Sequence, residues 1–113
     1  MTIDDLIAFG ADTEDGLRRC MNKEDFYLRM VKMVPGDANF QKLDDAIAAG
    51  DLDAAFEAAH ALKGSAGNLS LTPIAAPVME VTELLRARTE MDYSLLVAEI
   101  LKQRAALESI CSA

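Results

Sequence analysis

The amino-acid sequence predicts an all-α protein, an antiparallel four-helix bundle with additional short N-terminal helices. Apolar residues recur at spacings of three and four almost throughout the chain, and no segment alternates apolar and polar residues for long enough to form a strand. Short groups of capping and turn-forming residues separate the helical segments, which favours antiparallel neighbours. Hydrophobic residues make up 51% of the 113 residues, enough to close a core without disulfides or a metal.

The first part of the chain, about residues 2–34, is expected to form cap helices that pack across one end of the bundle. Thr2 precedes Asp5 by three residues, a capping-box spacing that predicts a short helix there. Asn22 is a good N-cap residue for a later helix over 23–34. A Pro-Gly pair then ends that helix.

The bundle itself is expected from four longer helices. They are predicted over about 38–49, about 52–69, about 72–88, and from Thr89 or Asp92 to about 111. Asp51 or Asp53 can cap the second, and Thr72 with Pro73 supplies a cap and a first-turn proline for the third. Pro77 either kinks the third helix or marks the start of its regular part. No repeat or linker indicates a second domain, so residues 1–113 are interpreted as one domain.

The apolar spacing also predicts which side chains face the core. In the first bundle helix the inward residues are expected to include Phe40, Leu43, Ile47 and Ala48. In the last they are expected to include Leu95, Leu96, Ala98, Leu101, Ala105 and Ile110.

Charge and targeting patterns exclude several classes of partner. Eleven Lys and Arg against nineteen Asp and Glu give a net charge of −8, which argues against nucleic-acid binding. The first sixteen residues contain five acids and no Lys or Arg, the reverse of a secretory signal. The longest uncharged stretch, 64–79, is too short and too rich in Gly and Pro to span a bilayer. Cys20 and Cys111 stand alone in the sequence and resemble core residues rather than a bridge, so we expect a cytoplasmic protein.

The only histidine lies on the second bundle helix, outside its apolar stripe. On a helical projection the stripe covers roughly 160°; it consists of Leu52, Ala55, Phe56, Ala59, Leu62, Ala66 and Leu69. His60 lies roughly 120° from the centre of this stripe, on a strip that also contains Gly64 and Gly67. We therefore expect the imidazole to reach solvent.

Two glycines follow the histidine on its own strip, at i+4 and i+7. Each costs about 0.5–1 kcal/mol relative to Ala inside a helix. Gly64 could instead end the helix as a C-terminal cap, but the apolar stripe continues at Ala66 and Leu69 and favours a longer helix. A helix that keeps Gly64 and Gly67 presents a bare surface on which the backbone of another protein can dock.

The residue types around His60 suggest anionic group transfer. A neutral imidazole is nucleophilic near pH 7 and forms a phosphoramidate that can release its phosphoryl group again. Lys63, at i+3, can place an ammonium beside a negative group on the ring. The chain has no Ser/His/Asp arrangement recognisable from spacing and no G-x-x-x-x-G-K-[ST] loop. A phosphoryl donor would therefore be another protein or domain.

Residues 59–69, AHALKGSAGNL, closely resemble the signature of histidine-containing phosphotransfer (HPt) domains. The resemblance extends more loosely over nearly the whole chain, since the family fold is a four-helix bundle with extra N-terminal helices. It implies that His60 is the phosphorylated residue, that Lys63 assists the phosphoryl group, and that Gly64 leaves room for a receiver domain.

The same resemblance implies a phosphorelay carrier rather than a kinase. The implied partners are response-regulator receiver domains, which pass phosphate from and to an aspartate, and a hybrid sensor histidine kinase. The implied Mg²⁺ belongs to the receiver, so no cofactor or metal ligand is expected in this chain. A monomer is expected, because one exposed nucleophile suffices.

Two positions depart from the family pattern. Ser70 replaces a glycine that many members have ten residues after the histidine. Thr82 occupies, by ungapped counting, the place of a Gln or Glu that steadies the second imidazole nitrogen, and is shorter than either.

Two other functions compete with the carrier. A helical adaptor could dock a receiver domain or a partner helix on the glycine surface without being phosphorylated, although docking alone needs neither His60 nor Lys63. The phosphoacceptor domain of a sensor kinase would have an acid after the histidine, where this chain has Ala61.

Overall fold

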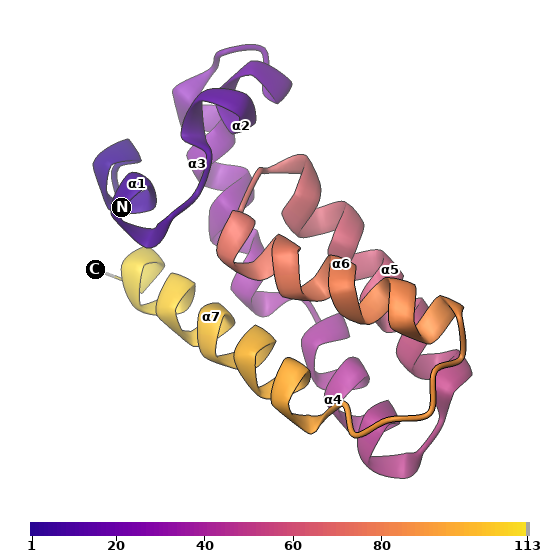
Figure 1. Ribbon diagram of the computed structural model, residues 1–113. Helices are drawn as coiled ribbons and strands as arrows, with labels where there is room; N and C mark the ends of the chain where they lie inside the picture. The colour runs from indigo at the N-terminus through magenta and orange to yellow at the C-terminus, as the bar shows by residue number, and fades with distance from the viewer. Residues whose placement is uncertain (113) are drawn as a thin grey trace.

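The computed structural model describes residues 1–112, and helices account for most of them (Figure 1). The elements are α1 (Ile3–Phe9), α2 (Thr13–Arg19), α3 (Glu24–Met33), a 3₁₀ turn η1 (Val34–Gly36), α4 (Asn39–Ala49), α5 (Leu52–Asn68), α6 (Thr72–Arg86) and α7 (Ser94–Ser112). No strand occurs within this part of the chain. The predicted all-α class is confirmed.

Four helices form the body of the molecule. α5 packs between α4 and α6, and α7 completes the ring by contacting both α6 and α4. Only the three residues 69–71 join α5 to α6, so these two packed helices must run in opposite directions. The short helices α1 to α3 lie at the end of the molecule where the N- and C-termini come close together (Figure 1). The molecule measures 41 × 25 × 20 Å.

One hydrophobic core joins the N-terminal helices to the bundle. It extends from Leu6 in α1 to Leu107 in α7. Its largest fully buried side chains include Tyr27, Phe40, Leu43, Leu62, Leu71, Ile74, Leu85 and Ile100. Cys20 is buried, and the half-buried Cys111 lies with its sulfur 3.7 Å from that of Met1. The two cysteines therefore serve as packing residues.

Most predicted helix ends are confirmed, but α7 begins at Ser94 rather than at Thr89 or Asp92, and two caps are corrected. Thr2 forms the expected capping box, and Asp51 caps α5 through a 3.1 Å hydrogen bond from the Ala54 amide. Asn22 does not cap α3, because its backbone is left-handed (φ 56) and the N-cap position falls at Lys23. Thr72 lies inside α6, where its hydroxyl contacts the Ser70 carbonyl instead of a first-turn amide.

α6 passes through Pro77 as one helix that starts at Thr72. Pro77 has no amide hydrogen, so the carbonyl of Pro73 loses its partner at i+4. The alternative in which the regular helix begins at Pro77 is therefore excluded. The helix ends at Arg86, two residues before the predicted end.

The predicted inward faces of α4 and α7 need correction. Ala48 is exposed, and Ala46 occupies the buried position on α4. Leu95 is 83% exposed and Ala98 and Ala105 are also exposed, whereas Val97 and Ile100 are buried. α7 has apolar residues on several faces, so its sequence does not single out the side that meets α6 and α4.

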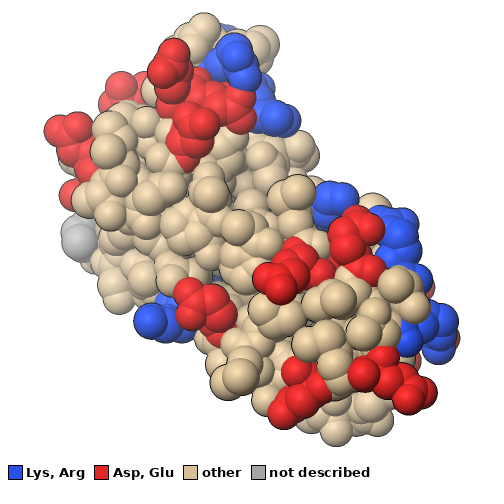
Figure 2. Space-filling view, viewed as in Figure 1, with Lys and Arg blue, Asp and Glu red and all other residues tan. Residues whose placement is uncertain are grey.

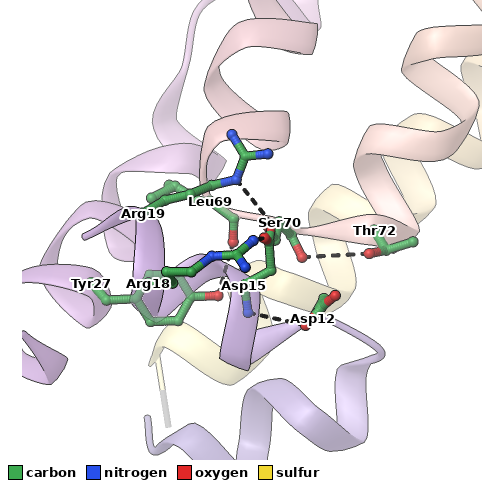
Figure 3. Close-up of polar contacts among 8 residues, drawn as sticks. All are labelled: Asp12, Asp15, Arg18, Arg19, Tyr27, Leu69, Ser70 and Thr72. Carbon is green, nitrogen blue, oxygen red and sulfur yellow. Dashed lines mark hydrogen bonds and ion pairs between the residues drawn. The ribbon is translucent and has the colours of Figure 1, made fainter. Parts of the chain in front are cut away.

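The N-terminal helices are fixed to the end of α5 by a group of polar contacts (Figure 3). The Tyr27 hydroxyl donates to the Leu69 carbonyl at 2.9 Å, and the Asp12 amide donates to the Ser70 carbonyl at 3.0 Å. The Ser70 hydroxyl donates to the Asp15 carboxylate at 2.5 Å. Burial raises the pKa of Tyr27 to about 12, so its hydroxyl remains a donor over the ordinary pH range.

Ser70 has a left-handed backbone, with φ at 54°. This conformation explains why a glycine suits the position, since glycine adopts it without strain. In this chain the serine side chain adds a bond to Asp15, which also binds Arg18 and Arg19. The departure from the family pattern therefore supplies a contact between α2 and the α5–α6 turn.

Acidic and basic side chains are intermixed on the surface (Figure 2). On the face shown, acidic groups gather over the N-terminal helices, and both signs occur around the opposite end of the bundle. The first half of α6 lies between them and has no charged residue over 72–79. No continuous basic surface occurs on this face.

Candidate functional site

The candidate site lies on α5, the bundle helix that packs between α4 and α6. The Asp51 cap fixes its start, and alanines let it approach α4 and α6 closely. Its buried face comprises Ala55, Ala58, Ala59, Leu62 and Ala66. Leu52 and Phe56, which we predicted on this face, are only half-buried because they lie at its edge. His60 lies on the other side of the helix and is exposed, as the projection predicts.

The two glycines of the strip lie inside a continuous helix. α5 extends to Asn68, so Gly64 does not act as a cap. Apart from adjacent residues and the backbone of α5 itself, no atom of residues 1–112 lies within 4 Å of a Cβ built at Gly64 or Gly67. Neither position has a left-handed φ. The protein's own packing therefore does not require glycine at either place.

The imidazole of His60 contacts one aromatic ring of its own helix. The ring centroids of Phe56 and His60 are 5.7 Å apart, and the two ring planes differ by only 11°. This is an offset-stacked arrangement within the usual range for aromatic pairs. The imidazole therefore lies nearly parallel to a neighbouring ring on its own helix.

Lys63 lies one turn from His60 and reaches toward α6. Its Nζ is 3.8 Å from an Oε atom of Glu83, and 36% of its side chain is exposed. Glu83 also binds the Nε of Arg86 at 3.3 Å. The Arg86 guanidinium lies 5.0 Å from the centroid of the Phe56 ring. Five side chains of α5 and α6 thus form one connected surface group: Phe56, His60, Lys63, Glu83 and Arg86.

The structure corrects the role predicted for Thr82. Its side chain is fully buried, and its hydroxyl donates to the Val78 carbonyl at 2.7 Å, within α6. It makes no hydrogen bond to His60 among the contacts of residues 1–112. The neighbouring residue Glu83 is the one that makes a polar contact with α5, through the Lys63 ammonium.

Sequence analysis missed Phe56, Glu83 and Arg86 as parts of the site. Phe56 was assigned to the core, although its i−4 spacing from His60 places it beside the imidazole. The sequence does not predict that Glu83 and Arg86 lie near His60, because their position depends on how α6 packs on α5. The sequence does give their spacing of three, which puts them on one side of α6.

Comparisons with known proteins bear on this site. The model of the Hpt domain family matches residues 36–111, which include α4 to α7 and all five side chains of the surface group. Comparison with curated proteins and with solved structures gives no match. Within residues 1–112, no helix is both long and apolar enough to cross a membrane. The chain belongs to the Hpt domain family, whose members carry phosphoryl groups on a histidine in phosphorelays and are not kinases.

Proposed function

We propose that the protein is a phosphorelay intermediate with His60 as its phosphorylated residue. It would accept a phosphoryl group from the aspartyl phosphate of one receiver domain and pass it to the aspartate of another. The observation that supports this best is the exposed imidazole beside two glycines that the fold itself does not need. A partner backbone can approach the helix there without meeting a side chain.

The transfer is a substitution at phosphorus. A ring nitrogen of neutral His60 attacks the phosphorus with its lone pair as the bond to the aspartate oxygen breaks. The aspartate leaves as a carboxylate, and the phosphoryl group remains on the ring until the reverse step delivers it to a second aspartate. Because the phosphoryl group is anionic throughout, a nearby cation lowers the barrier. We assign this part to Lys63, which follows His60 by three residues on α5.

The chain is proposed to act with partners that supply what it lacks. Receiver domains would bring both the aspartate and Mg²⁺, and a hybrid sensor histidine kinase would introduce the phosphate. The docking surface would centre on Gly64 and Gly67, next to His60 along α5. We propose that one copy of the chain suffices for each transfer.

The test uses the full chain, a phosphorylated receiver and Mg²⁺. We expect label on the wild-type protein that is lost in acid and kept in base, as a phosphoramidate requires, and no label on His60→Gln. His60→Gln should keep the wild-type helical signal and melting temperature, because the side chain is exposed.

The opposite result favours the adaptor. If several receivers bind the wild-type protein without labelling it, and His60→Gln binds them equally well, the carrier function is wrong. Binding measured by calorimetry separates this case from a mismatched receiver, which neither binds nor labels.

A further inference from the structure

Phe56 lies beside His60 in a way that fixes the plane of the imidazole. The two rings are nearly parallel, 11° apart, with centroids separated by 5.7 Å. His60 is exposed and makes no hydrogen bond within residues 1–112, so the Phe56 ring is the neighbour that can restrain the orientation of its imidazole. Parallel offset rings attract each other beyond simple burial.

The stack leaves the reactive atoms of the imidazole open. The nucleophilic lone pair lies in the plane of the ring, so phosphorus must approach along that plane. A phenyl ring stacked on the face blocks neither nitrogen. By restraining the imidazole, the Phe56 ring would limit the directions in which the nitrogen lone pair points. This favours alignment of the lone pair with the phosphorus of an incoming acyl phosphate.

Phe56 is itself restrained from α6. The Arg86 guanidinium lies 5.0 Å from the Phe56 ring centroid, at cation–π distance. Arg86 is held in turn by Glu83, which also pairs with Lys63. The contacts therefore link the nucleophile and the neighbouring cation through one set of side chains across two helices.

We propose that Phe56 is a positioning residue for phosphotransfer, an aromatic platform that orients the His60 imidazole for in-line attack. The inference rests on the proposed function, since it assigns a role within the same reaction. In this role Phe56 contacts neither the phosphoryl group nor the partner, and it acts only through His60. Removing its ring should slow the transfer roughly two- to tenfold, the factor that corresponds to the stacking preference of an aromatic pair.

A spectroscopic test needs no receiver. His60 is the only histidine, so the imidazole carbon-bound protons give unambiguous signals in a proton–carbon NMR spectrum. In the wild-type protein the phenyl ring current should shift these signals. Their positions should change in Phe56→Leu and stay near those of the wild type in Phe56→Tyr. Unchanged signals in Phe56→Leu overturn the inference.

The kinetic test compares matched phenylalanines. Phe26 on α3 is also half-buried with a guanidinium, that of Arg29, 5.5 Å from its centroid, but it has no histidine beside it. We expect Phe56→Leu to lower the rate constant for transfer within the receiver complex, and Phe26→Leu to leave it unchanged. Phe56→Tyr should restore it. Melting temperatures show that all three variants are folded at the assay temperature.

The outcomes separate this inference from the proposed function. Equal rates for the wild type and Phe56→Leu, with His60 labelled in both, overturn the platform and leave the carrier standing. A slow Phe56→Leu that Phe56→Tyr does not rescue also overturns it, because the loss then comes from packing. Absence of label on the wild type overturns both, whatever the NMR spectra show.

Discussion

Lys63, the cation that follows the candidate nucleophile by three residues, is already paired. Lys63 reaches an Oε atom of Glu83 at 3.8 Å, and Arg86 binds the other carboxylate oxygen. Both lysine and glutamate are partly exposed, so each ion pair contributes little to stability. A phosphoryl group on His60 would add a stronger anion next to Lys63. Glu83 and the phosphoryl group would then compete for the same ammonium.

This competition predicts how Glu83→Gln changes the equilibrium between phosphorylated His60 and the phosphorylated receiver. The neutral variant should release Lys63 and raise the fraction of phosphorylated His60 at equilibrium with a receiver, by at most about fivefold for a surface pair. The measurement is the ratio of labelled protein to labelled receiver at completion. Glu80→Gln removes the same charge one turn away, from a residue without an ion pair among those of residues 1–112, and should change the ratio less. Equal effects would show that only net charge matters.

Lys63→Ala should lower the rate of phosphotransfer. Losing one charge-assisted contact to the transferring group should slow transfer about tenfold, while the melting temperature stays close to that of the wild type. Single-turnover transfer from a labelled receiver measures the rate. Lys102→Ala, at an exposed position on α7, is the matched control. A wild-type rate in Lys63→Ala would remove this ammonium from the mechanism.

At the residue scale, local spacing was enough for the parts of the site on α5. The exposure of His60, and a continuous helix through Gly64 and Gly67, follow from the apolar stripe alone. The contribution of α6 was not predictable in the same way. Which of Thr82 and Glu83 is buried and which reaches Lys63 depends on the rotation of α6 about its axis, and sequence periodicity does not fix that rotation.

At the scale of elements, two glycines make α5 less stable than it could be at the proposed docking surface. Gly64→Ala should raise the free energy of unfolding by about 0.5–1 kcal/mol, because the added methyl meets open space. Gly64→Gln should also favour the helix, yet slow transfer by obstructing the partner. Chemical denaturation measures the first effect and labelled transfer the second. Full-speed transfer in Gly64→Gln would contradict the docking surface.

Gly16 on α2 provides the contrasting case. A Cβ there would lie 2.6 Å from the Tyr27 ring, so Gly16→Ala should lower the free energy of unfolding where Gly64→Ala raises it. The same substitution should thus change the free energy of unfolding in opposite directions at a glycine needed for internal packing and at one that faces open space.

Prediction of the elements succeeded where caps and breakers are strong. Gly50 has the left-handed conformation that a helix end requires, and Asp51 caps the next helix. α7 was harder, because its apolar residues lie on several faces. Leu95 therefore looked like a core residue and is almost fully exposed, since contacts with α4 and α6 decide which face is buried.

At the scale of the whole molecule, the ionisation of Asp15 makes the stability of the fold depend on pH, because Asp15 binds Ser70 in the α5–α6 turn. Hydrogen bonds from Ser70 and Arg19 lower the pKa of its carboxyl from 3.8 to about 2. A lowered pKa in the folded protein means that ionised Asp15 favours folding above pH 3.8 and that this contribution is lost as the pH falls toward about 2. We expect Asp15→Asn to lose less stability than the wild type across that interval.

Urea unfolding at several pH values across this interval measures the effect. Ser70→Gly is the companion variant, because it keeps a residue suited to φ 54 and removes only the hydroxyl. It should weaken the pH dependence without adding backbone strain. If both variants retain the full wild-type dependence, the acid sensitivity comes from other carboxylates.

The single imidazole on α5 also limits how many partners the proposed carrier can serve at one time. On the proposed function, the donor and the acceptor receiver would need the same glycine surface, so they could not occupy it together. Each cycle would then require the first partner to leave before the second arrives. An excess of either receiver in its unphosphorylated form would occupy the surface and slow phosphotransfer to the other receiver. The relative abundance of the two receivers would therefore control signalling.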